Sequence, residues 1–147
     1  MFSSRRRRRS EVSRGMLAAF FVSAGALHFV KPQPYEAIMP PQLPYPRELV
    51  YVSGVAEILG GLGVLSPRVR PWAGLWLIAL LIAVFPANVH HAIAADDIPG
   101  NPVSRPALIA RLPLQVLLIA WVWKTTGADR MRPRPSRARR VKEALRR

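Results

Sequence analysis

A small set of polar side chains within otherwise apolar stretches carries the chemistry that this sequence offers. Polar groups inside membrane-spanning helices are costly and usually face the bundle interior, so each is a candidate for ligand binding. Glu57 and Arg111 are the expected charge pair, because pairing removes much of the penalty of a lone charge in hydrocarbon. Arg111 and Gln115 share a helix face at i, i+4. The sequence predicts a ligand-binding pocket formed by His28, Glu57, Asn88, His91, Arg111 and Gln115.

Covalent and metal chemistry find little support. The chain has no cysteine, which excludes thiolate metal sites and cysteine nucleophiles. Histidine with glutamate could hold zinc or iron, but the adjacent His90 and His91 project about 100° apart on a helix, and no HExxH-like spacing occurs. No metal site is therefore predicted and no catalytic residue is identified. The sequence leaves open whether the protein is an enzyme.

Neighbouring residues support both a binding and a structural interpretation of the polar set. Gly60 and Gly61 follow Glu57 by three and four residues, so another helix can approach that face closely. Pro86 should kink its helix and free a carbonyl one turn earlier, which Asn88 or a ligand could satisfy. The structural alternative is that these polar groups only hold short helices together.

Four apolar stretches must position these side chains, and we expect helices at about 15–30, 49–65, 71–95 and 107–123. From Trp72 to Ala87 there is no charged or amide side chain, so this stretch lacks the polar face that a soluble four-helix bundle would need. The sequence predicts an all-α fold, an integral membrane four-helix bundle at 15–125, between basic tails at 1–14 and 126–147. The tails are expected to be disordered; after Thr125, Arg alternates with Pro, Ser and Ala.

The distribution of charge sets the expected topology. The chain carries a formal net charge of +14. Of its 22 Lys and Arg, six lie between Arg5 and Arg14 and ten lie from Lys124 onward. Because cytoplasmic segments are enriched in Lys and Arg, both termini are expected in the cytoplasm, with the helices in a bacterial plasma (inner) membrane. Every predicted pocket residue then falls in the outer half of the bilayer. A secretory signal peptide is the alternative for the first stretch, but no convincing cleavage site follows it.

The loop at 31–47 contains six prolines, which remove backbone donors and keep the chain extended. We expect it to lie as a stiff lid over the outer mouth of the bundle, with one helical turn at Tyr35 to Met39. At the inner side, an aromatic belt is expected from Trp72, Trp76, Trp121 and Trp123.

Several segments resemble the DoxX family of small four-helix bacterial and archaeal membrane proteins. The similar segments are Gly25-Ala26-Leu27-His28-Phe29, Ile38-Met39-Pro40-Pro41, Leu49 to Leu65, Val84 to Asn88 and Arg111-Leu112-Pro113-Leu114-Gln115. The resemblance implies the fold, a membrane location and, through the electron-transfer complex that gives the family its name, a redox association. It implies functional roles for the matching polar positions His28, Glu57, Asn88, Arg111 and Gln115.

These observations give two functional hypotheses. The first is a small subunit or partner of a membrane redox or stress-response system that binds a quinone-like or lipid-like molecule in the outer-leaflet pocket. Its partners would be membrane or peripheral redox proteins, and a quinone is the candidate cofactor. The second is a non-catalytic membrane assembly or scaffold subunit. At the basic tails, anionic lipid is favoured over nucleic acid, because no aromatic residues are interleaved with the Arg runs.

Overall fold

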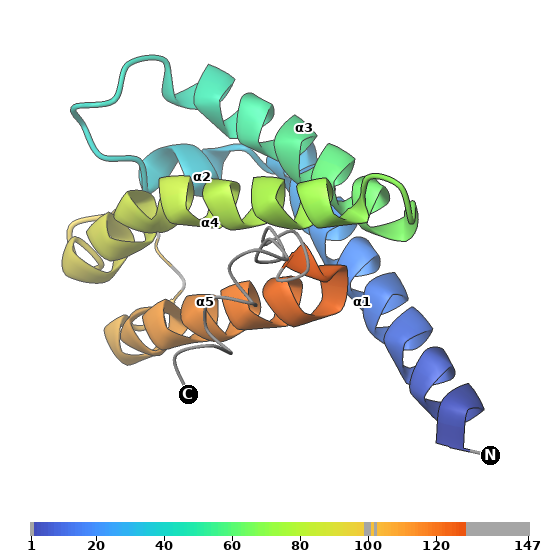
Figure 1. Cartoon of the computed structure of the whole chain (residues 1–147). Helices are drawn as coiled ribbons and strands as arrows, with labels where there is room; N and C mark the ends of the chain where they lie inside the picture. The colour runs from blue at the N-terminus through green and yellow to red at the C-terminus, as the bar shows by residue number, and fades with distance from the viewer. Residues whose placement is uncertain (1, 99–100, 102, 129–147) are drawn as a thin grey trace, which may run out of the picture.

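The computed structural model describes residues 2–98, 101 and 103–128, and this part of the chain is helical without strands. Figure 1 shows its five helices: α1 (Phe2–Val30), α2 (Gln33–Ala37), α3 (Pro46–Leu65), α4 (Arg70–Ile93) and α5 (Arg105–Thr126). The all-α prediction is confirmed. The C-terminal basic tail, predicted to be disordered, lies outside the described residues from position 129 onward.

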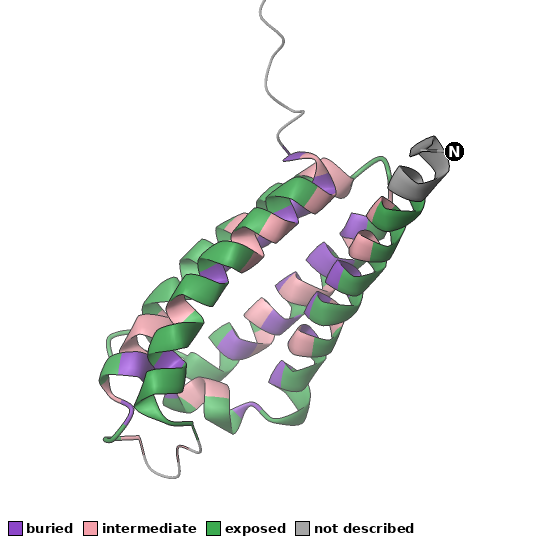
Figure 2. Cartoon of the chain, turned by 90° about the horizontal axis from the view of Figure 1, so that it is seen from below, coloured by how far each residue is buried: buried purple, intermediate pink, exposed green. Residues whose placement is uncertain are grey.

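Four of the helices are long enough and apolar enough to cross a membrane, over Arg8–Val30, Pro46–Leu65, Arg70–Ile93 and Arg105–Thr126. Each carries large apolar side chains on its outer surface, among them Phe20, Val52, Ile82 and Leu117. Figure 2 shows the buried residues gathered mainly on the facing sides of these helices and the exposed residues on their outer sides.

The first helix is longer than the sequence predicted. Its apolar part begins near Gly15, but α1 continues back to Phe2 through the arginine run, a segment expected to be disordered. Arginine is a good helix former, and neither proline nor glycine precedes Gly15. The helix therefore extends beyond the apolar stretch, and the expectation of a disordered tail over residues 2–14 is wrong.

Helices α1 and α3 cross at two glycines. A Cβ atom on Gly54 would lie 2.8 Å from the Cβ of His28 and 2.9 Å from the carbonyl oxygen of Gly25. Real Cβ atoms do not approach other atoms so closely, so glycine is required on α3 at this crossing. Gly61 also faces α1, beside Phe21, whereas Gly60 faces Leu77 of α4. Gly60 and Gly61 thus allow α4 and α1, respectively, to approach α3 closely.

The apolar core lies where α1, α3, α4 and α5 meet, and its fully buried members are Leu17, Phe21, Val64, Leu77 and Val122. Near the start of α1, the hydroxyl of Ser13 lies 3.0 Å from that of Thr125 on α5 and accepts a hydrogen bond of 2.9 Å from Trp121 Nε1. The start of α1 and the end of α5 therefore lie at the same end of the bundle.

The proline-rich loop packs against the other end. Its helix α2 covers Gln33–Ala37, close to the turn expected at Tyr35 to Met39. Ile38 is buried, and its carbonyl oxygen lies 3.1 Å from Nδ1 of His90 on α4. Because a carbonyl can only accept, His90 donates this bond. The loop is thus tied to α4 beside the polar residues.

Candidate polar site beneath the proline-rich loop

His28 is buried, with 6 % of its surface exposed, at the crossing of α1 and α3. Its Nδ1 lies 3.2 Å from the hydroxyl oxygen of Ser53, and that hydroxyl lies 2.8 Å from the carbonyl of Val50. The single hydroxyl proton of Ser53 is used on the carbonyl, so Nδ1 of His28 must be the donor. In a neutral ring this leaves Nε2 as a free acceptor.

Tyr35 on α2 packs edge-on against this histidine, with 4.0 Å between ring centroids and an interplanar angle of 75°. Burial raises the pKa of the Tyr35 hydroxyl above its ordinary value; the charge of Glu57 raises it further and that of Arg111 lowers it. Tyr35 therefore keeps its proton at neutral pH. The same electrostatic effects place Tyr35, Glu57 and Arg111 in one neighbourhood, although they come from α2, α3 and α5.

Glu57 and Arg111 do not form the expected ion pair. Glu57 Oε2 is buried and has no hydrogen-bond partner, and neither residue forms a salt bridge within the described part of the chain. Arg111 is exposed on α5. The physical reason is the packing of α5, which lies mainly against α4 and makes little direct contact with α3, the helix that carries Glu57.

Asn88 and Gln115 bond directly and join α4 to α5. Asn88 Nδ2 donates to Gln115 Oε1 over 2.8 Å, and Gln115 Nε2 donates to the carbonyl of Leu81. The carbonyl that lacks its helical donor because of Pro86 belongs to Ile82, the next residue. The side chain of Gln115 thus bonds to α4 next to Ile82, the residue whose carbonyl loses its helical donor to Pro86. These hydrogen bonds link α4 to α5 within the protein.

His91 belongs to a separate network. The side-chain amide of Asn101 donates to Ala95 O over 2.9 Å, which orients its oxygen toward Val103 N and toward His91 Nε2, each at 3.2 Å. His91 Nε2 therefore carries the proton, and its buried Nδ1 has no hydrogen-bond partner in the part of the chain that the structure describes. His90 instead bonds to the loop, so the two adjacent histidines have different partners.

The six predicted residues thus form three groups: His28, Glu57 and Arg111 around Tyr35; the bonded pair Asn88 and Gln115; and His91 with Asn101. Sequence reasoning did not select Tyr35, Ser53 or Asn101. Ser53 lies four residues before Glu57, a spacing that would have placed it on the same face of α3. Among the described residues, no group of three or more His, Cys, Asp or Glu could hold a metal ion.

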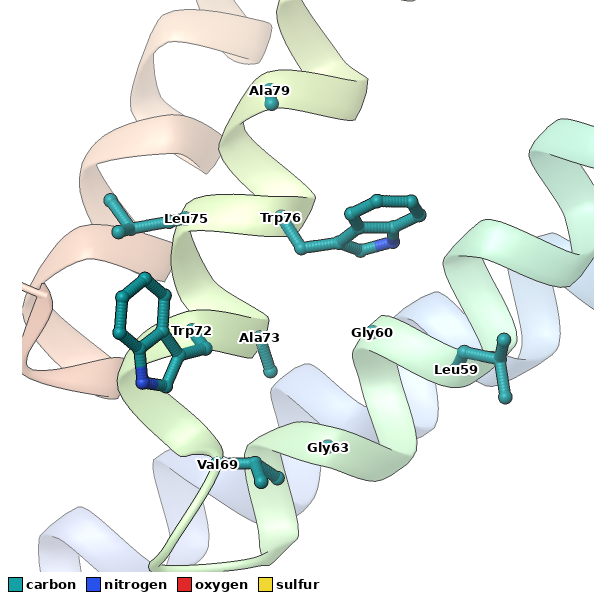
Figure 3. A pocket seen from close by; sticks show the side chains of 9 residues that line it. All are labelled: Leu59, Gly60, Gly63, Val69, Trp72, Ala73, Leu75, Trp76 and Ala79. Atoms are coloured by element: carbon teal, nitrogen blue, oxygen red, sulfur yellow. The ribbon is translucent and has the colours of Figure 1, made fainter.

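An apolar groove of about 540 Å³ lies elsewhere, between α3 and α4 toward their connecting turn. Figure 3 shows Gly60 and Gly63 of α3 opposite Ala73 of α4, with Trp72 and Trp76 beside them. Trp76 Nε1 donates to Ala56 O over 3.1 Å. The residues that line the groove include no titratable side chain, so the polar cluster is the better candidate for chemistry.

Comparison with known proteins identifies a family but no activity. The model of a family described as Domain of unknown function (DUF8561) matches residues 17–126. No curated protein and no solved structure matches the chain. The membership in the DoxX family expected from sequence is therefore wrong. Gly54, one of the residues behind that resemblance, is required for packing at the crossing of α1 and α3, so it is no sign of a shared function. The chain belongs to the DUF8561 family.

Proposed function

We propose that this member of the DUF8561 family is an integral membrane protein whose four long helices cross the plasma (inner) membrane. Four helices of sufficient length and hydropathy support this proposal, as do the apolar side chains on their outer surfaces. The basic segments at both ends favour cytoplasmic termini. The proline-rich loop and the α4–α5 loop then face the outside.

Single cysteines test this topology cleanly, because the chain has none of its own. Cysteine at Pro41 or Asp97 should react with a membrane-impermeant maleimide in intact cells, and cysteine at Pro67 should react only after permeabilisation. Labelling of Pro41→Cys and Asp97→Cys from opposite sides, or recovery of the chain in the soluble fraction after carbonate washing, would contradict the proposal.

The second part of the proposal is that the cluster around Tyr35 binds the polar head of a quinone-like or lipid-like molecule. It rests on one observation: a buried oxygen of Glu57 has no hydrogen-bond partner among the described residues. An unsatisfied buried carboxylate oxygen is costly, so a partner from outside the chain would stabilise it. A hydroxyl on the bound molecule could donate to Glu57 while a carbonyl or phosphate oxygen accepts from Arg111. The proton on Tyr35 provides a further donor.

Mass spectrometry of small molecules retained by the protein in mild detergent tests this binding. The native protein should retain a quinone or a specific lipid in stoichiometric amount. Glu57→Gln should reduce retention by about tenfold or more, since hydrogen bonds to charged groups contribute about 1.5–3 kcal/mol. Glu48→Gln is the matched control, because Glu48 is an exposed carboxylate of the same helix. Retention of neither molecule, or equal losses in both variants, would contradict the binding proposal.

A non-catalytic assembly or scaffold subunit is the second candidate. The hydrogen bonds that join Asn88, Gln115 and the Leu81 carbonyl favour it, because they link α4 to α5 within the protein. On this alternative, Gln115→Ala lowers the melting temperature, Glu57→Gln leaves the bound small molecules unchanged, and other membrane proteins co-purify with the chain. No redox partner is proposed, because that expectation came with the family resemblance that proved wrong.

A further inference from the structure

A second polar site, a pocket, lies at the opposite end of the bundle, where residues 10–14 of α1 meet the α3–α4 turn. Its volume is about 560 Å³, and its lining residues are Ser10, Glu11, Arg14, Leu65, Pro67 and Arg70. Two arginines therefore face one hollow, with an apolar wall from the α3–α4 turn. Nothing proposed above for the polar site beneath the proline-rich loop uses these residues.

Arg70 is held in place by the end of α3. Its Nε donates to Val64 O over 2.7 Å and its Nη2 donates to Leu65 O over 3.3 Å. These carbonyls belong to the last turn of α3, where a helix has unpaired acceptors and a partial negative charge. Arg70 is thus fixed at the pocket wall, and part of its guanidinium is already engaged.

Arg14 lies close enough to Arg70 for their like charges to interact, and it has no such partner. Its Nε is buried without a hydrogen-bond acceptor, and it forms no ion pair in the described part of the chain. Glu11 and Ser10 also line the pocket, and each has interactions of its own. A buried guanidinium N–H without an acceptor, beside a second guanidinium, is costly unless an anion supplies the acceptor.

The backbone adds to this positive potential. Helix α4 begins at Arg70 and is 24 residues long, and its N-cap residue, Val69, makes no side-chain cap. The N-terminus of such a helix carries a partial positive charge that favours anions. Arginine suits oxyanions with several acceptors, because its planar fork can donate two parallel hydrogen bonds to phosphate.

We propose that this pocket binds a phosphate group, with Arg14 as the principal donor and Arg70 as the fixed second charge. The phosphate could belong to the headgroup of an anionic phospholipid or to free inorganic phosphate. In the topology proposed above, the pocket opens toward the cytoplasmic leaflet. Leu65 and Pro67 would then contact the apolar part of a lipid.

Native mass spectrometry of the full chain in detergent tests the proposal, with phosphatidylglycerol, phosphatidylcholine and inorganic phosphate titrated separately. The native protein should bind one phosphatidylglycerol or one phosphate ion more tightly than phosphatidylcholine. Arg14→Gln should weaken that binding about tenfold, as expected for the loss of charge-assisted hydrogen bonds. The side chain of Arg14 forms no hydrogen bond or ion pair in the described part of the chain, so this substitution removes no internal contact of that kind. Arg14→Lys keeps the charge without the planar fork, so its affinity should lie between that of the native protein and that of Arg14→Gln.

Arg68→Gln is the matched control, because Arg68 lies in the α3–α4 turn beside the pocket, is exposed and does not line the pocket. It should weaken binding by about twofold or less, since exposed charges act mainly through screened long-range attraction. Binding of phosphatidylglycerol alone identifies the lipid as the source, and Arg14-dependent binding of inorganic phosphate identifies the free ion. The proposal is overturned if neither binds, if phosphatidylcholine binds equally well, or if Arg14→Gln and Arg68→Gln have equal effects.

Discussion

The crossing of α1 and α3 makes a quantitative prediction about Gly54→Ala. The added methyl group would lie 2.9 Å from the Gly25 carbonyl oxygen and 2.8 Å from the His28 Cβ. Neither atom can rotate away, because one is backbone and the other is attached directly to it. The two helices must therefore separate, and His28 must move relative to Ser53.

The magnitude follows from two opposing effects. Overpacking of a close contact destabilises by about 1–3 kcal/mol. Replacing glycine by alanine within a helix stabilises by about 1 kcal/mol through helix propensity. Gly15→Ala on α1 isolates the second effect, because a Cβ there would meet nothing within 4 Å. Because the propensity effect is common to both variants, Gly54→Ala should be less stable than Gly15→Ala by about 1–3 kcal/mol.

The assay is reversible unfolding in mixed micelles of dodecyl maltoside and sodium dodecyl sulfate, followed by circular dichroism. Gly54→Ala should be less stable than the native protein, and Gly15→Ala should be more stable. At the lower end of the range, the stability of Gly54→Ala should equal that of the native protein. Equal stability of the two variants would refute the close crossing, and with it the position assigned to His28.

Two further predictions concern contacts between helices, and a third concerns the ionisation of Tyr35. Asn88→Ala and Gln115→Ala in a double-mutant cycle should show a coupling energy of about 0.6–1.7 kcal/mol, the range for hydrogen bonds between membrane helices; zero coupling would contradict their bond. Trp121→Phe should destabilise by about 1 kcal/mol through loss of the bond to Ser13, and Ser13→Ala should add little to it. The midpoint of Tyr35 ionisation should lie above the ordinary tyrosine value of 10.0, because burial raises its pKa; ultraviolet titration against Tyr35→Phe measures this, and a midpoint at or below that value would contradict it.

The patterns of residues predicted the helices well where apolar stretches have clear limits. Pro46 and Pro71 stand in the first turns of α3 and α4, where proline is tolerated, and Gly127 ends α5 in a left-handed conformation. The start of α1 was missed, because hydropathy marks where a helix becomes apolar and says nothing about whether it continues through arginines. The extended α1 is the reason why Arg14 can contribute to a pocket.

The polar site shows a different limit. Burial cost alone identified Glu57, Arg111, Asn88 and Gln115 as residues that need partners, and the bond between Asn88 and Gln115 is of the expected kind. The prediction that Arg111 pairs with Glu57 was wrong, because Arg111 can reach Glu57 only if α5 packs against α3. The sequence contains no signal for which neighbour α5 selects. In the structure α5 lies mainly against α4.

The sequence by itself determined that the chain forms apolar helices, which residues in them are too polar to remain unpartnered, and at which ends the positive charge collects. These properties are local: they depend on side-chain chemistry and on a helical period that every segment carries within itself. Only the tertiary structure decided that Tyr35 joins His28, that Glu57 keeps a buried oxygen free, and that Arg14 faces Arg70. Those outcomes depend on the crossing points and rotations of whole helices, which are set by close contacts such as that between Gly25 and Gly54.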